Sequence, residues 1–317
     1  MEKDNHKILL ICDLAGYGKV ALSALIPIYS HMKCETFNLP TAIISNPFDY
    51  GKYDILDTTA YMRNTIGIWE ELGFSFDAIC TGFIASEEQS KLVFDYCRKQ
   101  RELGTAIFVD PVMGDKGVLY NGIGESTVFY MKKMCAISDI IMPNATEAMF
   151  LTDIKPERKC GYKTIFSNED MDRIVARLRE MGSRSIVITS ANIEGNACTI
   201  ISEDGSEGWK ALPYNEIPVE FSGTGDLFSS LVTSKRMHGI PLEEAVRSTM
   251  DTVERLIRIN RDNVDKYKGL LMGKGRLKDT LREAIASPVL RAIIIGMIFG
   301  ASGLYKALQP SGIAGII

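Results

Sequence analysis

The sequence contains little histidine and little tryptophan, with three and two residues among 317. The histidines are not spaced as a metal-binding pair, so we do not expect a histidine-rich metal centre. The seven cysteines are an odd number, form no C-x-x-C pair, and lie partly inside apolar runs such as ILLICDL. We therefore expect buried, reduced thiols rather than disulfides or a zinc site, as is typical of a cytoplasmic protein.

The chain also lacks a surplus of positive charge. Thirty-six basic and forty acidic residues give a net charge of −4, whereas general binders of nucleic acids or anionic membranes need a positive field. A local basic pocket for a phosphate remains compatible with this charge. The hydrophobic content of 46% excludes intrinsic disorder. The polar start MEKDNHK predicts that no signal peptide is present.

Short apolar runs recur along the chain and predict a buried parallel sheet. Each run is continuous rather than alternating, as expected for strands that are covered on both faces. The predicted strands are residues 7–12, 78–81, 106–109, 140–142 and 185–189. The length is compatible with two average domains or with one large α/β domain.

Amphipathic segments lie between these runs and predict helices. Two of them begin with capping-box patterns, one from Ser86 to Gln89 and one from Ser167 to Asp170. The predicted helices are residues 20–32, 58–72, 87–103, 126–134, 168–181, 225–238 and 241–258. Residues 197–202 and 208–212 predict an antiparallel hairpin at the sheet edge. The alternation of strands and helices predicts an α/β sandwich.

Ligands of such sheets bind at the carboxyl ends of the strands, so the loops there are the first places to search. The segment Ser222-Gly-Thr-Gly-Asp226 precedes a predicted helix. Its glycines allow successive N–H groups to point the same way at the positive end of the helix dipole, which favours an anion. Asp226 would repel a phosphate unless it accepts a proton. The alternative is a plain glycine turn in which Asp226 stabilises the helix start.

Two further loops carry carboxylates. Asp110 and Asp115 belong to the segment DPVMGD after a predicted strand. They could hold a hydrated Mg²⁺ ion or order phosphates, or they form an ordinary polar turn. Asn144 and Glu147 follow another predicted strand and have the spacing of a helix cap and its capping-box partner. The alternative is that Glu147 binds Mg²⁺-bound water beside ATP.

The segment Gly16-Tyr-Gly-Lys19 is similar to part of a Walker A loop but does not complete one. The pattern G-x-x-x-x-G-K-[ST] requires Gly at position 13 and Ser or Thr at position 20, where this chain has Asp13 and Val20. No G-x-G-x-x-G follows the first predicted strand, so a Rossmann nucleotide site is excluded as well.

Five motifs of the chain, and the order in which they occur, resemble those of the ribokinase-like superfamily, and within it those of the pyridoxal/pyridoxine/pyridoxamine (vitamin B6) kinase branch. Gly223-Thr-Gly-Asp226 resembles the anion-hole and base motif of the superfamily, and DPVMGD resembles the "DPV-x-GD" loop of the branch. The other three are TAIISN from Thr41, TGFIAS from Thr81 and VITS from Val187. The resemblance covers about residues 7–270 and implies a three-layer α/β sandwich, with a mostly parallel central sheet and helices on both faces.

The resemblance implies an ATP-dependent kinase that phosphorylates the 5′-hydroxymethyl group of B6 vitamers, giving pyridoxal 5′-phosphate or its analogues in salvage. It implies that Asp226 is the base and that the anion hole consists of Gly223, Thr224 and Gly225. The implied nucleotide-binding residues are Asp110, Asp115, Asn144, Thr189, Ser190, Val219 and Thr224. The implied substrate-binding residues are Asp13, Thr41, Phe83 and Asp226, and the implied metal ligands are Asp110, Asp115 and Glu147. ATP and Mg²⁺ are the implied cofactors, with a monovalent cation such as K⁺ left open, and a homodimer is the implied assembly.

The chain departs from the branch at several substrate-side positions. Asp13 stands where many members place serine against the pyridine ring, Phe83 replaces a common tyrosine, and Pro47 replaces a common histidine. These departures leave open the choice among pyridoxal, pyridoxine and pyridoxamine. One alternative is a hydroxymethylpyrimidine kinase, which shares the fold. Another is a non-catalytic B6- or nucleotide-binding protein, against which the intact Gly-Thr-Gly-Asp motif argues.

The resemblance ends near Lys274, so we predict a kinase domain over residues 1–273 and an atypical hydrophobic tail over 274–317. Residues 292–304 carry no charge and no strong polarity, whereas a helix that spans a membrane needs about 20 such residues. Three interpretations stay open: a helix docked on the body or on a partner subunit, a peripheral membrane anchor, or a non-native, frameshifted end. No nucleic-acid partner is expected, and only the tail leaves a membrane partner open.

Overall fold

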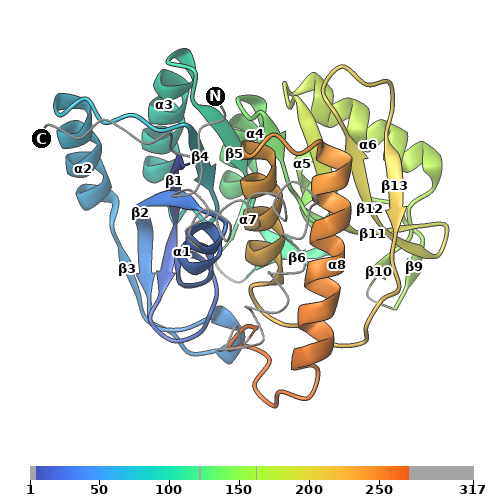
Figure 1. Cartoon of the computed structure of the whole chain (residues 1–317). Coiled ribbons are helices and arrows are strands. Elements are labelled where there is room, and N and C mark those ends of the chain that lie inside the picture. Colours follow the sequence, from blue (N-terminus) through green and yellow to red (C-terminus); the bar gives the residue numbers. More distant parts are fainter. Residues whose placement is uncertain (1–4, 121–122, 162, 271–317) are drawn as a thin grey trace, which may run out of the picture. The chain divides into compact units, whose positions relative to one another are not determined.

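The centre of the structure, a computed structural model, is a nine-stranded sheet. The structure describes residues 5–270 except 121–122 and 162. The strands of the sheet are β1 (His6–Ala15), β2 (Cys34–Ile44), β3 (Ile55–Asp57), β4 (Ala78–Thr81), β5 (Ala106–Val109), β8 (Ile140–Ile141), β11 (Ser185–Ile193), β12 (Asn196–Ser202) and β13 (Lys210–Pro213). Their order is β13-β12-β11-β8-β5-β4-β1-β2-β3 (Figure 1). The six strands from β11 to β2 are parallel, and β3, β12 and β13 are antiparallel at the two edges.

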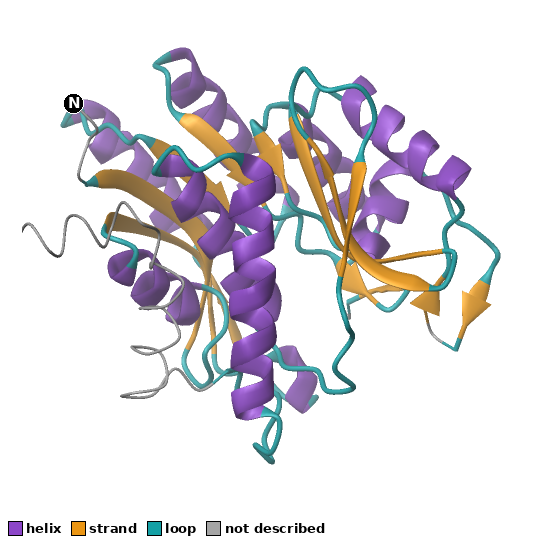
Figure 2. Ribbon diagram, turned by 45° about the vertical axis from the view of Figure 1, so that its right-hand side comes forward, coloured by secondary structure: helices purple, strands orange, loops and turns teal. Residues whose placement is uncertain are grey.

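Helices cover both faces of this sheet (Figure 2). One face carries α1 (Leu22–His31), α7 (Thr224–Met237) and α8 (Leu242–Asn260), which pack side by side (Figure 1). The other face carries α2 (Thr59–Glu71), α3 (Glu87–Glu102), α4 (Glu125–Ala136), α5 (Ala145–Thr152) and α6 (Asn168–Glu180). Outside the large sheet lie two short hairpins and one 3-10 turn: β6 (Gly114–Asp115) with β7 (Val118–Leu119), β9 (Lys159–Cys160) with β10 (Lys163–Thr164), and η1 (Phe48–Tyr50).

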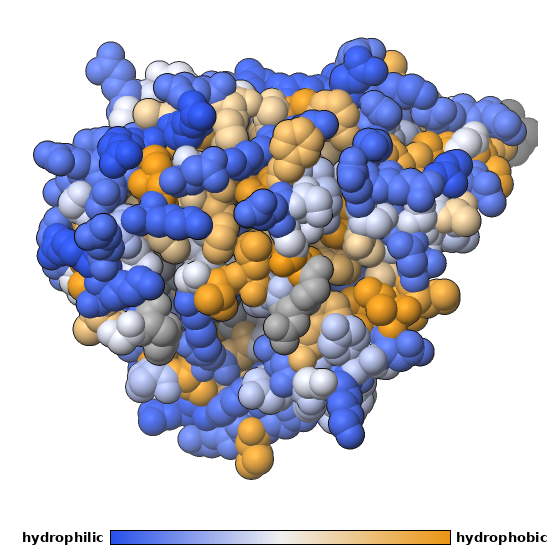
Figure 3. Space-filling view, turned by 180° about the vertical axis from the view of Figure 1, so that it is seen from behind, coloured by the Kyte–Doolittle hydropathy of each residue, from blue (hydrophilic) through white to orange (hydrophobic). Residues whose placement is uncertain are grey.

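The apolar run in β1 explains why the sheet is buried on both faces. The side chains from Ile8 to Ile11 are completely inaccessible to solvent, because helices cover both sides of this central strand. The face of the molecule that is hidden in Figure 1 consists largely of charged side chains with apolar residues between them (Figure 3). The predicted three-layer α/β architecture is therefore confirmed.

The helix starts follow the sequence signals with one exception. Ser167 and Asp170 form a complete capping box at α6. At α3 the Ser86 side chain accepts the Gln89 N–H, as predicted, but the Gln89 side chain does not close the box. The Gln89 Oε1 atom instead accepts the N–H of Ala85, and its Nε2 atom donates to the Thr41 carbonyl oxygen. This side chain therefore ties α3 to β2.

Two expectations from the sequence are incomplete. Strand β2 was not predicted, because its polar residues and Pro40 interrupt the apolar pattern although it pairs with β1 along most of its length. The seven thiols are all unpaired and five of them are buried, but Cys160 on the β9–β10 hairpin is exposed, which contradicts the expected burial.

The predicted hydrophobic tail, 274–317, lies outside the described residues. Within the part of the chain that the structure describes, no helix is both long enough and apolar enough to cross a membrane.

Candidate active site

Four neighbouring parallel strands end at the same edge of the sheet and carry the polar residues of the site. In the order β8, β5, β4 and β1, the residues near the strand ends are Asn144, Asp110, Thr81 and Asp13, of which Asp13 lies two residues before the end of β1. The N–H of Asp110 donates to the Thr81 carbonyl oxygen at 2.9 Å, which continues the sheet pairing beyond β5. The topology therefore brings together segments that are far apart in the sequence.

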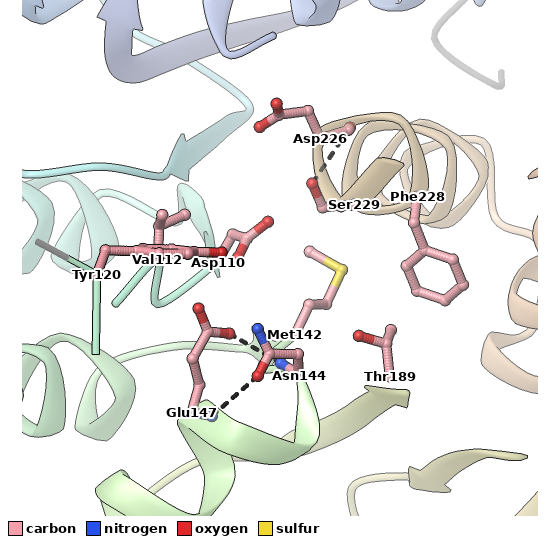
Figure 4. A pocket seen from close by; sticks show the side chains of 11 residues that line it. Asp110, Val112, Tyr120, Met142, Asn144, Glu147, Thr189, Asp226, Phe228 and Ser229 are labelled. Atoms are coloured by element: carbon pink, nitrogen blue, oxygen red, sulfur yellow. Dashed lines mark hydrogen bonds between the residues drawn. The ribbon is translucent and has the colours of Figure 1, made fainter. Parts of the chain in front are cut away.

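A cavity of about 150 Å³ opens above these strand ends, next to the start of α7. Its lining residues are Asp110, Val112, Tyr120, Met142, Asn144, Glu147, Thr189, Gly225, Asp226, Phe228 and Ser229. Figure 4 shows that Asp226 approaches from α7, Asp110 from the loop after β5, and Glu147 from α5. No basic side chain is among the described residues that line it. The cavity is therefore acidic.

The start of α7 is shaped by a glycine and by an unusual alanine. Gly223 caps the helix with φ = 80°, and a Cβ atom there would lie 2.8 Å from the Lys19 carbonyl oxygen, so only glycine is accommodated. The Asp226 Oδ2 atom accepts the N–H of Ala21 at 2.8 Å. Ala21 has φ = 48°, a conformation that alanine rarely adopts. The bond helps to hold this strained residue at the start of α1.

A short segment after α8, residues 265–269, passes beside the loop after β1 and the Gly-Thr-Gly turn. We call this segment the strap. The Lys268 carbonyl oxygen accepts the N–H of Lys19 at 2.8 Å. At Gly269, where φ is 84°, a Cβ atom would lie 2.4 Å from the Lys19 carbonyl oxygen and 3.3 Å from that of Ser222. The strap thus packs backbone against backbone on the loop after β1 and on the Gly-Thr-Gly turn.

The buried Glu147 and the partly buried Asp110 form an acidic pair. Glu147 is 3% exposed, and its two carboxylate oxygens accept the N–H groups of Met113 and Asn144 at 3.0 and 2.8 Å. Burial, followed by the nearby charge of Asp110, holds the pKa of Glu147 well above its ordinary value. Burial, followed by the charge of Asp226, raises the pKa of Asp110 to about 7.

Asp226 and Asp13 form a second acidic neighbourhood. Burial raises the pKa of Asp226, and the hydrogen bond from Ala21 opposes this effect. Asp13 is 8% exposed. Burial, followed by the charge of Asp226, raises the pKa of Asp13 to about 7, while the hydrogen bond from the Cys12 thiol lowers it. All four of these carboxylates therefore have raised pKa values.

The structure brings some of the predicted site residues into the cavity and leaves others outside its lining. The predicted residues that line it are Asp110, Asn144, Glu147, Thr189, Gly225 and Asp226. Those outside the lining are Asp13, Thr41, Phe83, Asp115, Ser190, Val219, Gly223 and Thr224. Among these, the Thr41 hydroxyl donates to the Phe83 carbonyl oxygen at 2.7 Å, which joins the two predicted substrate-side residues. Asp115 is the last residue of β6, next to the turn of the β6–β7 hairpin, where its side chain accepts the N–H of Lys116.

The predicted capping box of Asn144 and Glu147 is confirmed. The two residues form a complete capping box at the start of α5, and they also line the cavity. Sequence reasoning missed Ser229, although it stands one helical turn after Asp226 and its spacing could have indicated it. It also missed Ala21, for which the sequence has no signal, because alanine carries no preference for this conformation.

Comparison with known proteins identifies the family. The model of the phosphomethylpyrimidine kinase family matches residues 30–272. This chain belongs to that family. It is 30% identical over 198 residues to a pyridoxal kinase from Arabidopsis thaliana, and this match covers 60% of each protein. It is 29% identical over 246 residues to a pyridoxal kinase from Dictyostelium discoideum, which covers 71% of this chain and 76% of that one. The chain thus spans less than two thirds of the length of the Arabidopsis protein.

Solved structures of similar proteins agree with this family. A Bacteroides thetaiotaomicron protein, described provisionally as a phosphomethylpyrimidine kinase, superimposes with a TM-score of 0.80 at 30% identity and covers 88% of this chain and 95% of its own. A second crystal form of that protein contains pyridoxal. A pyridoxal kinase from Lactobacillus plantarum has a TM-score of 0.76 at 23% identity, with 89% and 97% covered, and supports the fold. The predicted family, fold and enzyme class, a kinase acting on a hydroxyl group, are therefore confirmed.

Proposed function

We propose that this protein uses ATP to phosphorylate the 5′-hydroxymethyl group of B6 vitamers, yielding pyridoxal 5′-phosphate or its analogues in salvage. The observation that carries this proposal is the position of Asp226, in the first turn of α7 at the edge of an acidic cavity, directly after the Gly-Thr-Gly turn. The similarity to pyridoxal kinases and to a protein crystallised with pyridoxal supports it. A Leishmania donovani pyridoxal kinase of this fold has been crystallised with ADP.

Asp226 has the chemistry of a general base for this reaction. A neutral primary hydroxyl group is a weak nucleophile, and a carboxylate within reach accepts its proton as the attack on phosphorus proceeds. Burial raises the pKa of Asp226 toward the working pH, which strengthens it as a base. The N–H groups of Gly223, Thr224 and Gly225 lie at the positive end of the α7 dipole, where they stabilise charge on the transferred phosphoryl group.

The carboxylates of Asp110 and Glu147 match the donor set of Mg²⁺, which prefers oxygen ligands. Burial raises the pKa of both groups, with the charge of Asp110 adding to the effect at Glu147 and the charge of Asp226 adding to it at Asp110. No basic side chain among the described lining residues balances them. In the described ranges, no group of three or more His, Cys, Asp or Glu residues could enclose an ion. Mg²⁺ in proteins is commonly held by one or two carboxylates together with phosphates and water. When bound, Mg²⁺ neutralises phosphate charge.

The remaining roles follow the family pattern. We assign Asn144 and Thr189 to the phosphates of ATP, since both line the cavity, and we retain Ser190, Val219, Thr224 and Asp115 as more distant nucleotide-side residues. We assign Thr41, Phe83 and Asp13 to the vitamer. A monovalent cation requirement and a homodimer belong to the same proposal. The cytoplasm is the proposed location, because the seven cysteines are unpaired.

A substrate panel tests the proposed function. ADP release is measured with the full chain, ATP and Mg²⁺, using pyridoxal, pyridoxine, pyridoxamine, hydroxymethylpyrimidine and ribose in parallel. Turnover of at least one B6 vitamer above that of the other compounds is the expected result. Preferred turnover of hydroxymethylpyrimidine would instead support the second candidate, which the name of the matching family favours. ADP release with none of them would leave only a binding protein.

A further inference from the structure

Asp13 occupies a break in the sheet at the edge of the site. The last pair between β1 and β4 joins Ile11 to Thr81. Beyond it β1 continues beside β2, and Leu14 forms an isolated bridge with Ala21. The register between β1 and β2 shifts between Cys12 and Leu14, so Asp13 sits at an irregularity of the strand. A side chain at this position lies at the carboxyl edge, where substrates of such sheets bind.

Asp13 is a buried carboxylate without a cationic partner in the described structure. Among the residues that the structure describes, the only side chain that donates a hydrogen bond to it is the Cys12 thiol, at 3.5 Å. By contrast, Asp139 is paired with Arg184 at 3.1 Å and with Arg101 at 3.7 Å. Leu14, the residue after Asp13, bridges to Ala21, whose N–H donates to Asp226 at 2.8 Å, so Asp226 lies close to Asp13. The charge that acts most strongly on Asp13 is that of this second acid. Burying a carboxylate beside a second one is costly unless a cation joins them.

The proposed substrates differ at one position, which is close to the reacting group. The 4-substituent is an aldehyde in pyridoxal, a hydroxymethyl group in pyridoxine and an aminomethyl group in pyridoxamine. It is attached to the ring carbon next to the one that bears the 5-hydroxymethyl group. When the 5-hydroxymethyl oxygen lies at Asp226, a carboxylate near Asp226 is in reach of the 4-substituent. Resting on the proposed function, we infer that Asp13 binds the ammonium form of the 4-aminomethyl group and makes pyridoxamine the preferred vitamer.

The chemistry of the carboxylate gives an order among the three vitamers. An ionised carboxylate only accepts hydrogen bonds. It forms a hydrogen-bonded ion pair with the ammonium of pyridoxamine, a hydrogen bond to an uncharged donor with the hydroxyl of pyridoxine, and none with the aldehyde oxygen of pyridoxal. A serine, which many members of the branch carry here, both donates and accepts and so discriminates little. The ammonium also reduces the repulsion between Asp13 and Asp226.

The test compares kcat/KM for the three vitamers in wild type, Asp13→Asn and Asp13→Ser. We expect wild type to prefer pyridoxamine. Loss of a hydrogen bond to a charged group should lower kcat/KM for pyridoxamine by about 10- to 100-fold in both variants, and the values for pyridoxine and pyridoxal should change less than about threefold. Asp95→Asn is the matched control, since it removes the same charge from an exposed position on α3 and should leave all three values unchanged.

Several outcomes would overturn the inference. A uniform loss on all three vitamers, in variants that melt like wild type, would place Asp13 in general structure. A wild-type preference for pyridoxal, or for hydroxymethylpyrimidine, would overturn it as well. Because serine occurs at this position in many members, Asp13→Ser preserves the test if Asp13→Asn fails to fold. A wild-type protein that phosphorylates no vitamer refutes the proposed function instead, so the two failures are distinguishable.

Discussion

Replacing Asp226 by asparagine tests the proposed chemistry most directly. The change keeps the size and shape of the side chain and removes its ability to take a proton. The amide oxygen of asparagine can still accept the N–H of Ala21, which Asp226 accepts at 2.8 Å. The strained start of α1 therefore keeps its partner, and the variant isolates the loss of the base.

General-base assistance is typically worth about 10²–10⁴-fold in rate, which corresponds to about 2.7–5.4 kcal/mol of transition-state stabilisation. We expect kcat of Asp226→Asn to fall by that range, while KM for ATP changes less than about threefold, because Asp226 lies on the side of the accepting hydroxyl. The melting temperature should equal or exceed that of wild type, since burial raises the pKa of Asp226 and its ionised form therefore opposes folding.

The assay is ADP release under saturating ATP and Mg²⁺ with the best vitamer from the panel, together with thermal denaturation. Asp95→Asn, with an exposed carboxylate on α3, is the control for net charge. A kcat within about threefold of wild type would show that Asp226 is not the base, and its role would reduce to stabilising the start of α7. A large loss of melting temperature would show that the charge itself is structural, contrary to the reasoning above.

The other predictions concern glycine packing, the tail and pH. Gly269→Ala should displace the strap and lower kcat at least about tenfold, because its Cβ would lie 2.4 Å from the Lys19 carbonyl oxygen. Gly67→Ala in α2 is the control and should keep wild-type activity, since no described atom lies within 4 Å of the added Cβ. Equal kinetics for the two variants would refute the role of the strap. A chain ending at Gly273 should keep its activity and a chain ending before the strap should lose it, whereas folded but inactive protein ending at 273 would show that the tail takes part. Since Asp13 has a raised pKa of about 7 beside Cys12 and Asp226, its ionisation opposes folding as the pH rises from about 4 to about 7. The melting temperature of Asp13→Asn relative to wild type should therefore increase over that interval, and a pH-independent difference would contradict this reasoning.

Much of the fold was predictable because its determinants are local. The strands β4 and β5 begin and end where their continuous apolar runs do, since a central parallel strand needs no polar face. The start of α6 follows directly from Ser167 and Asp170, which complete a capping box within four residues. Strand β2 escaped prediction because its polar residues pair with β1 through the backbone, which leaves no periodic signal in the side chains.

The candidate site was predictable in part. Asp226, Asp110 and Glu147 were found because each belongs to a short motif whose residue types carry a definite chemistry, and all three line the cavity. Asp115 belongs to one of the same motifs, yet the β6–β7 hairpin places it outside the lining. A motif fixes residue types and spacing, but the fold of the loop decides which of its side chains face the cavity.

The sequence by itself determined the α/β class, the family and the order of the chemical motifs, because these are properties of neighbouring residues. Only the tertiary structure decided that Asp13 is buried beside Asp226, that the strained Ala21 donates its N–H to Asp226, and that Gly269 packs against the loop after β1. These contacts join residues more than 200 positions apart, and they arise from the order of the strands and the packing of α1 against α7. Burial and mutual repulsion then set the pKa values of the acidic groups, which no stretch of sequence encodes by itself.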